Sequence, residues 1–309
     1  MTARLLKKAG QFLLFIWAAG SLTFFMVRTV PGDPLLAILG PNPNTQDVLR
    51  LQRSLQLDRP LAAQYARFLA RLAVLDLGES LVDRRPVMAT MLKYLPNTAR
   101  LALAAMTLTV PLSLLLGFLS AYKENRFWTG LALAFSVTGL AIPVFLIGLF
   151  LILVFSLELG IFPVSGSGGG KFIVLPALTL AIPLGAFLTR MVRTVLKEEA
   201  HRPYVLLAMA KGLSRAQVYR RHILRNALVP IVTLVGMQAG ALLSGAIVVE
   251  SVFSWPGIGT LLVRAVHQRD FPMIQGTVLL LASLYLVLNL LVDLSYPLLD
   301  PRIGHDRAG

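Results

Sequence analysis

The chain has 309 residues, of which 56% are hydrophobic and only 14% are charged, and its mean hydropathy is +0.72. Soluble domains are roughly half apolar with about a quarter of their residues charged, so this composition excludes a soluble core and indicates an integral membrane protein. The sequence contains no cysteine, which excludes disulfides, Cys-ligated zinc and iron–sulfur clusters, and its net charge of +14 has to be interpreted by location.

Six apolar runs are long enough to cross a bilayer, which needs about 20 residues, with a range of roughly 17–25. The third run is too long for one upright span and too short for two with a turn, and Pro143 lies within it. Because proline kinks a helix and tilt absorbs extra length, we count this run as one kinked span. The sequence therefore predicts an all-α membrane protein with six spans, at 10–27, 101–122, 127–157, 172–189, 227–249 and 273–292.

Lys and Arg in the short loops predict the orientation of the spans, because these residues concentrate on the cytoplasmic side. With a cytoplasmic N-terminus, the inner segments hold sixteen Lys and Arg, of which nine lie in residues 190–226, and the short outer loops hold three. We therefore expect both termini in the cytoplasm. Residues 190–226, called here the basic loop, carry a large share of the net charge.

The segment 31–97 lies outside in this topology and contains apolar residues at helical spacing, namely Leu61, Tyr65, Phe68, Leu69 and Leu72. Asp58 is expected to cap this helix, and Pro60 suits its first turn. The segment is interpreted either as a helical cap over the membrane or as a docking surface for an external substrate carrier. The predicted organisation is a tail and first span (1–30), an external helical segment (31–97), a core of five spans (98–299) and a cytoplasmic tail (300–309).

The basic loop has the local signals of two short helices joined by a tight corner. Pro203 suits a first helical turn, and Gly212 stands where a helix favours a left-handed residue after its end. Ser214 and Gln217 form a capping box for a second helix, which runs into the span that starts near residue 227. Such an element is short, rigid and anchored at both ends, so it can transmit force.

The basic loop has two other interpretations. Its nine cations alone favour a loop that only fixes the membrane topology and contacts anionic lipid. The two helix caps favour a docking element instead. Residues 212–223 also loosely resemble half of a helix-turn-helix. Because they continue into a span, they have little freedom to enter a major groove, and no nucleic-acid partner is expected.

The fifth span carries small residues on one face, Gly236, Gly240 and Ser244, and a polar Gln238 in its middle. Small residues allow close helix packing, either within the chain or with a partner chain. A mid-span glutamine is costly unless it is hydrogen-bonded or faces water, so Gln238 is a candidate for lining a pathway. These four residues are the predicted pathway and packing positions.

No acidic or basic residue lies near the middle of any span, whereas proton- or ion-driven transport usually needs a buried titratable relay. The glycine-rich residues 166–171 do not match a Walker A motif, so ATP hydrolysis is expected on another chain. The four histidines form no HExxH motif and no close pair. We therefore expect no metal, cofactor or catalytic residue, and a membrane-embedded enzyme is the unfavoured alternative.

Eight short motifs follow one another along nearly the whole chain. They are Pro-Gly-Asp-Pro at 31–34, Leu-Asp-Arg-Pro at 57–60, Asp-Leu-Gly-Glu-Ser at 76–80, Ala-Lys-Gly-Leu at 210–213, Arg-His-Ile-Leu-Arg-Asn-Ala at 221–227, Glu-Ser-Val-Phe-Ser-Trp-Pro-Gly-Ile-Gly at 250–259, Arg-Asp-Phe-Pro at 269–272 and Asp-Pro-Arg at 300–302. In this order they resemble the membrane permease subunit of bacterial ABC importers of the dipeptide, oligopeptide and nickel type.

The resemblance implies a MetI-like core that forms half of an inner-membrane pore. The implied cargo is di- or oligopeptides, with nickel, a metal–chelator complex or glutathione as alternatives. The implied partners are a second homologous permease chain, two cytoplasmic ATPase subunits, an external substrate-binding protein and membrane lipid.

Within this resemblance, the surroundings of Gly212 are similar to the EAA motif, whose helix docks into a groove of the ATPase. The chain departs from the generic motif, because Leu206, Leu207 and Ala208 stand where Glu-Ala-Ala is expected. The residues implied in ATPase coupling are Tyr204, Ala208, Ala210, Lys211, Gly212, Leu213, Ser214, His222, Arg225 and Asn226.

Overall fold

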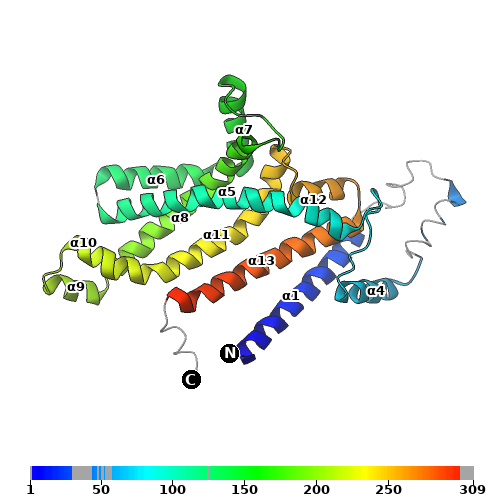
Figure 1. Ribbon diagram of the computed structural model, residues 1–309, viewed down its shortest axis with the longest axis horizontal. Coiled ribbons are helices and arrows are strands. Elements are labelled where there is room, and N and C mark those ends of the chain that lie inside the picture. Colours follow the sequence, from blue (N-terminus) through cyan, green and yellow to red (C-terminus); the bar gives the residue numbers. More distant parts are fainter. Residues whose placement is uncertain are drawn as a thin grey trace. The chain divides into compact units, whose positions relative to one another are not determined.

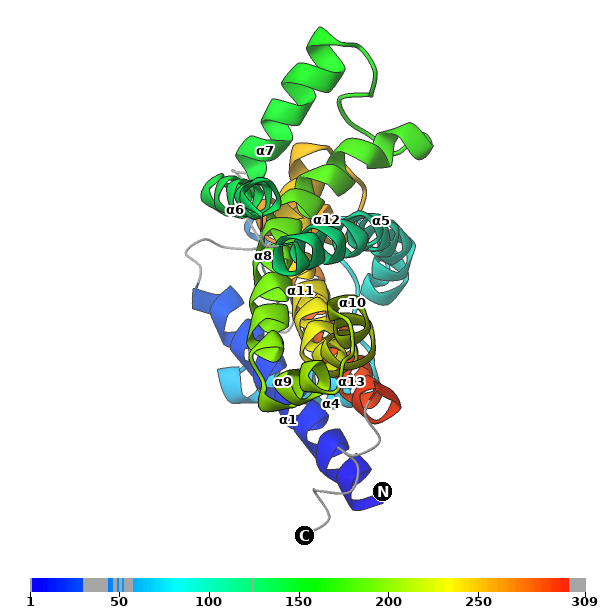
Figure 2. The same ribbon diagram turned by 90° about the vertical axis from the view of Figure 1, so that its left-hand side faces the viewer.

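The computed structural model describes residues 2–29, 44–46, 49, 52, 58–123 and 125–299, and most of these lie in helices (Figures 1 and 2). In chain order the elements are α1 (Thr2–Thr29), α4 (Leu61–Ala73), α5 (Val87–Tyr122), α6 (Arg126–Ala141), α7 (Val144–Leu151), the π-helix η1 (Ile152–Glu158), the 3₁₀ helix η2 (Gly170–Ile173), α8 (Val174–Ala200), α9 (Pro203–Ala210), α10 (Arg215–Val218), the π-helix η3 (Tyr219–Ile223), α11 (Leu224–Val252), α12 (Ile258–His267) and α13 (Phe271–Leu299).

The chain separates into two compact units. Unit 1 comprises Met1–Thr98 and Pro256–Leu286, and unit 2 comprises Ala99–Trp255 and Val287–Gly309. This division reflects packing alone, so the predicted order of external segment and five-span core stays a prediction.

Five of the six predicted apolar runs lie on one continuous helical stretch each, and the third is divided between α6 and α7–η1, which confirms the all-helical membrane class. The count of six spans is not reached among the described residues, because α1 contributes only a shorter apolar stretch, Gly10–Met26. Four helical stretches are long and apolar enough to cross a bilayer, and a bent pair formed by α6 with α7–η1 makes a fifth if it is one span. The four are Val87–Tyr122, Gly170–Ala200, Arg215–Leu243 and Phe271–Ser295.

The third run is broken rather than kinked. Its two helical parts meet at an angle of 102°, at a break next to Pro143. Ile142 is extended, with φ −90° and ψ 124°, because the ring of a following proline disfavours helical backbone at the preceding residue. The prediction of one kinked span underestimated this break.

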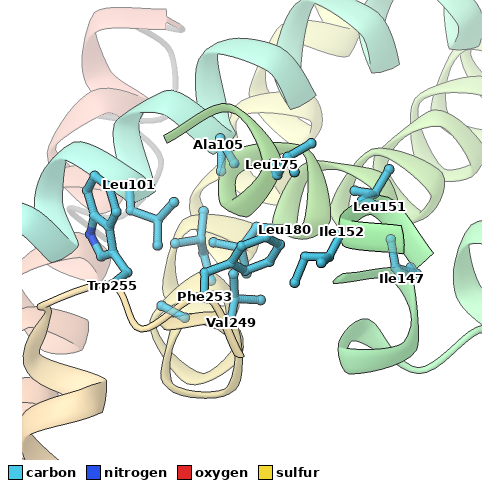
Figure 3. Packing of buried hydrophobic residues seen from close by; sticks show 13 residues of the cluster. Leu101, Ala105, Ile147, Leu151, Ile152, Leu175, Leu180, Val249, Phe253 and Trp255 are labelled. Atoms are coloured by element: carbon cyan, nitrogen blue, oxygen red, sulfur yellow. The ribbon is translucent and has the colours of Figure 1, made fainter. Parts of the chain in front are cut away.

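Unit 2 packs around α8, which lies against both α6 and α11 (Figure 1). Its larger core joins Leu101 of α5 and Leu180 of α8 to Phe253 and Trp255, which follow α11 (Figure 3). Glycines allow the closest approaches. A Cβ atom on Gly139 would lie 2.6 Å from the Cβ of Ala186. The small residues that were predicted to pack closely lie in the fifth span, so this contact between α6 and α8 was not predicted.

In unit 1, the predicted helix after the first span is confirmed as α4, which packs on α1. Phe24 contacts the rings of Tyr65 and Phe68 at centroid distances of 5.2 and 5.3 Å. The predicted cap is wrong, because α4 begins after Pro60 and receives no side-chain hydrogen bond at its N-terminus. The carbonyl of Pro60 accepts from the backbone N–H of Ala63 at 2.9 Å. Asp58 is therefore not the cap.

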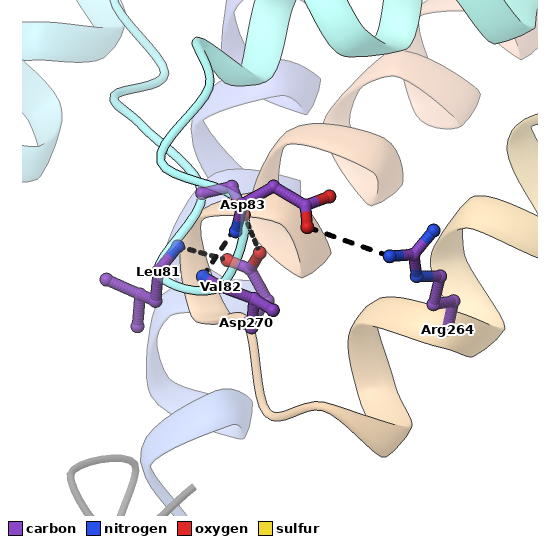
Figure 4. Close-up of polar contacts among 6 residues, drawn as sticks. Leu81, Val82, Asp83, Arg264 and Asp270 are labelled. Atoms are coloured by element: carbon purple, nitrogen blue, oxygen red, sulfur yellow. Dashed lines mark hydrogen bonds and ion pairs between the residues drawn. The ribbon is translucent and has the colours of Figure 1, made fainter. Parts of the chain in front are cut away.

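A second part of unit 1 is organised by a buried carboxylate. The side chain of Asp270, only 3% exposed, accepts hydrogen bonds from the hydroxyl of Ser80 and from the backbone N–H of Leu81, the latter at 3.1 Å (Figure 4). It also accepts from the N–H of Met273 at 3.4 Å, in the first turn of α13. Residues 76–86, called here the clamped loop, are thereby fixed to the start of α13.

Candidate functional site

The basic loop forms the helix–corner–helix unit that the sequence predicts. Arg202 is extended, and Pro203 opens α9 without sacrificing a needed N–H donor. The second helical segment starts with α10 and continues through η3 into α11. Its π-helical turn, Tyr219–Ile223, is a feature that no sequence signal indicated.

The corner at Gly212 has the predicted left-handed backbone, with φ +82°. Gly212 N–H donates to the carbonyl of Met209 at 2.9 Å, and Leu213 N–H donates to that of Ala208 at 3.3 Å. These two bonds form a Schellman motif, which satisfies carbonyls that the helix end would leave free. A Cβ atom on Gly212 would meet nothing within 4 Å, so backbone strain alone disfavours a side chain there.

The second helix starts with the predicted capping box. Ser214 N–H donates to Oε1 of Gln217 at 2.9 Å, and Gln217 N–H donates to Oγ of Ser214 at 3.4 Å. Both bonds are local, and together they satisfy donors that a helix start leaves unpaired. The corner is therefore defined on both sides by hydrogen bonds.

The inner face of the basic loop is anchored by apolar packing. Val205 and Ala208 of α9 and Ile223 of η3 are buried in one cluster with Val192 and Leu196 of α8. Burial of this kind stabilises by roughly 1.5–3 kcal/mol for each large apolar side chain. Within the basic loop, α9 and the π-helical turn are therefore packed against the end of α8.

Aromatic contacts attach the same loop to the last turn of α5. The hydroxyl of Tyr219 donates to the carbonyl of Ala121 at 3.3 Å, and its ring meets that of Tyr122 edge-on at 4.9 Å. The Arg215 guanidinium lies 5.5 Å from the Tyr122 ring and 5.8 Å from the Tyr219 ring. Such cation–π contacts are worth about 0.5–1 kcal/mol at exposed sites.

Three of the predicted site residues lie close together in the loop, namely Tyr204, His222 and Asn226. The hydroxyl of Tyr204 donates to Oε1 of Glu199 at 2.7 Å, and its ring lies 6.4 Å from that of His222. Burial raises the pKa of Tyr204 to about 12; a hydrogen bond with Asn226 lowers it, and the contact with Glu199 raises it. Tyr204 therefore stays protonated at physiological pH and links α9 to α8 and α11.

The outer face of α9 is apolar and exposed. Leu206, Leu207 and Met209 are 69%, 59% and 49% exposed. The two leucines depart from the EAA-type motif, and their position beside the small Ala208 was the sequence signal for an exposed apolar face, which was not predicted. Ala208 itself is 7% exposed and supports the helix from within. The other predicted residues on the exposed surface are Ala210, Lys211, Gly212, Ser214, Arg225 and Asn226, whereas Leu213 is half-buried.

The four predicted positions in the fifth span lie in α11. A Cβ atom on Gly236 would lie 2.1 Å from Cγ2 of Val292 in α13, so this glycine packs within the chain. Gly240 is buried and Gln238 is half-buried. The side chain of Ser244 lies outside the described part of the structure. A role of Gln238 in a pathway stays a prediction.

Residues 113–305 match the family described as the binding-protein-dependent transport system inner membrane component. Residues 1–102 match the N-terminal part described for the same membrane components. Together the two matches cover nearly the whole chain.

Two relatives match over most of their length. The glutathione transport system permease protein GsiC of Shigella flexneri serotype 5b is 38% identical over 284 residues, which cover 92% of this chain and 93% of that protein. A Brucella abortus protein named "Putative peptide transport system permease protein" is 34% identical over 314 residues, covering 99% of this chain and 100% of that protein.

A solved structure shares the fold. An inward-facing form of the MetNI methionine ABC transporter superposes with a TM-score of 0.53 at 15% identity, covering 69% of this chain and 97% of that chain. At this identity the likeness concerns the fold alone.

Proposed function

Because the chain belongs to the family of inner-membrane components of binding-protein-dependent transport systems, we propose that its basic loop is the surface on which a separate ATPase chain acts. The chain is a transmembrane permease subunit of such an ABC importer. ATP binding and hydrolysis belong, in this proposal, to the partner that docks on α9.

The observation that carries the proposal is the contrast between the two faces of α9. Its inner face is buried against α8 and η3, whereas Leu206, Leu207 and Met209 are exposed. The exposed cations Arg202 and Lys211 flank α9 in the sequence. Exposed apolar side chains rimmed by polar residues are typical of protein–protein contact sites. A partner that covered them and then moved would carry the packed loop, and with it α8 and α11.

The proposed assembly has two permease chains, two cytoplasmic ATPase subunits and an external substrate-binding protein. Both termini and the basic loop lie in the cytoplasm, as the Lys and Arg distribution favours. Because the chain lacks cysteine, single cysteines report the orientation. Ser167→Cys should react with an impermeant thiol reagent in intact cells and Ser214→Cys only after lysis; the reverse pattern would overturn the orientation.

The proposed cargo is a small peptide. The two relatives described above are named as glutathione and peptide permeases, and both span nearly the whole chain. Glutathione is itself a tripeptide, so the two names share one substrate chemistry. Nickel or a metal chelate is the weaker alternative, and uptake of a radiolabelled dipeptide by the reconstituted importer decides between them.

The docking surface is tested by making it polar. The double variant Leu206→Asp with Leu207→Asp should insert normally, because exposed side chains contribute little to the fold, but its ATPase should no longer co-purify. Leu159→Asp is the matched control, since Leu159 is 56% exposed and lies outside the basic loop. Equal recovery of the ATPase with the parent protein, the double variant and the Leu159→Asp control would contradict the proposal.

A further inference from the structure

Unit 1 contains a cavity of about 520 Å³ between the clamped loop, the first turns of α5 and one face of α12. Arg85, Lys93 and Arg264 line it together with Asp83, and its apolar lining includes Tyr94 and Leu261. This volume lies within the range of roughly 300–1,000 Å³ that is usual for small-molecule sites. The cavity is called here the cationic pocket.

The charges of the pocket do not cancel. Asp83 Oδ1 lies 3.6 Å from Nη2 of Arg264, which leaves one carboxylate paired with one guanidinium (Figure 4). In the part of the chain that the structure describes, neither Arg85 nor Lys93 has an ion-pair partner. Two cations are therefore available to a ligand. The buried Leu261 and half-buried Tyr94 supply apolar surface beside them.

The wall that carries Arg85 is held rigidly. The backbone carbonyl of Arg85 accepts from Ser80 N–H at 2.9 Å, and Val87 N–H donates to the carbonyl of Gly78 at 2.9 Å. Ser80 is itself bonded to the buried Asp270, so the internally hydrogen-bonded loop is also fixed to the segment that precedes α13. A site whose backbone is already ordered loses less conformational entropy when a ligand binds.

We propose that the cationic pocket binds a carboxylate-bearing small molecule of dipeptide to tripeptide size. Arg85 and Lys93 take the carboxylate, and Tyr94 and Leu261 contact the less polar part of the ligand. A single acidic side chain from a docked protein would leave most of this volume unfilled, which favours a free molecule. The inference rests on the proposed function, in which the cargo is a small peptide, and assigns that cargo a contact site on this chain.

The test measures equilibrium binding of radiolabelled dialanine to the assembled importer in nanodiscs, in competition with unlabelled dialanine or dialanine amide. The amide lacks the carboxylate and should compete at least about tenfold less well. The double variant Arg85→Gln with Lys93→Gln should lose at least about tenfold in dialanine affinity. Arg84→Gln is the matched control, because Arg84 is the exposed neighbour of Arg85 and does not line the pocket.

Equal competition by the acid and the amide, or unchanged affinity of the double variant, would overturn the inference. It would also be overturned if dialanine did not bind and the double variant instead lost its binding protein, because the pocket would then hold a protein side chain. ATP-dependent uptake is measured in parallel. Normal uptake without any effect at the pocket contradicts only this inference, whereas absence of uptake by the parent importer contradicts the proposed function.

Discussion

The basic loop and the clamped loop are held in place by different forces. Ile223 and its neighbours anchor the basic loop by apolar burial, and the helix caps at Gly212 and Ser214 shape its corner. The clamped loop depends on one buried carboxylate, Asp270, that accepts several hydrogen bonds. Apolar packing has no fixed direction and lets a loop move with its helices, whereas hydrogen bonds are directional, so those to the carboxylate fix the backbone of the clamped loop.

The largest effect is expected when the apolar packing of the basic loop is weakened. Ile223→Ala removes a side chain that is fully buried, which costs about 2–5 kcal/mol. Amide hydrogen exchange in residues 203–223 should become faster, while exchange in residues 78–86 stays unchanged. Leu228→Ala is the control, because Leu228 is 43% exposed on the helix that follows. Faster exchange in both loops would mean that they do not depend on separate forces.

The next largest effect is expected when the Asp270 carboxylate, which holds the clamped loop, is removed. Asp270→Ala leaves the Leu81 N–H buried without an acceptor, which costs about 1–3 kcal/mol. The Ser80 hydroxyl loses its acceptor but still accepts from the N–H groups of Val82 and Asp83. Exchange should now accelerate in residues 78–86 and not in the basic loop. Asp83→Ala, which removes only a half-exposed ion-pair partner, should change little. If Asp270→Ala leaves residues 78–86 protected, the carboxylate does not hold this loop.

The same contrast explains how much the sequence could predict. The Gly212 corner and the Ser214 capping box depend on residues no more than five positions apart, so local chemistry was sufficient. The bond between Ser80 and Asp270 joins residues 190 positions apart, and no local pattern indicates it. Both residues lie in motifs that carried the family resemblance, but the resemblance gave no physical reason for their pairing.

Two features were predicted wrongly or missed because residue type alone was used to assign them. Asp58 was expected to cap a helix because of its residue type, yet Pro60 occupies the cap position without any side-chain bond. The exposed apolar face of α9 was missed because leucine in a membrane protein is ordinarily assigned to lipid or core. Only the burial of Val205 and Ala208 on the opposite side shows which face remains free.

Transport per inserted molecule in Gly212→Val and Arg221→Ala tests the central claim most directly. Valine at φ +82° costs roughly 1–2 kcal/mol of backbone strain and has open space around it, so it should disturb the corner without a steric clash. We predict that Gly212→Val inserts normally but docks its ATPase weakly and transports poorly. Arg221→Ala should transport nearly as the parent does, since Arg221 is exposed. Normal transport by Gly212→Val together with loss in Arg221→Ala would show that the loop acts as a charge patch and not as a rigid lever.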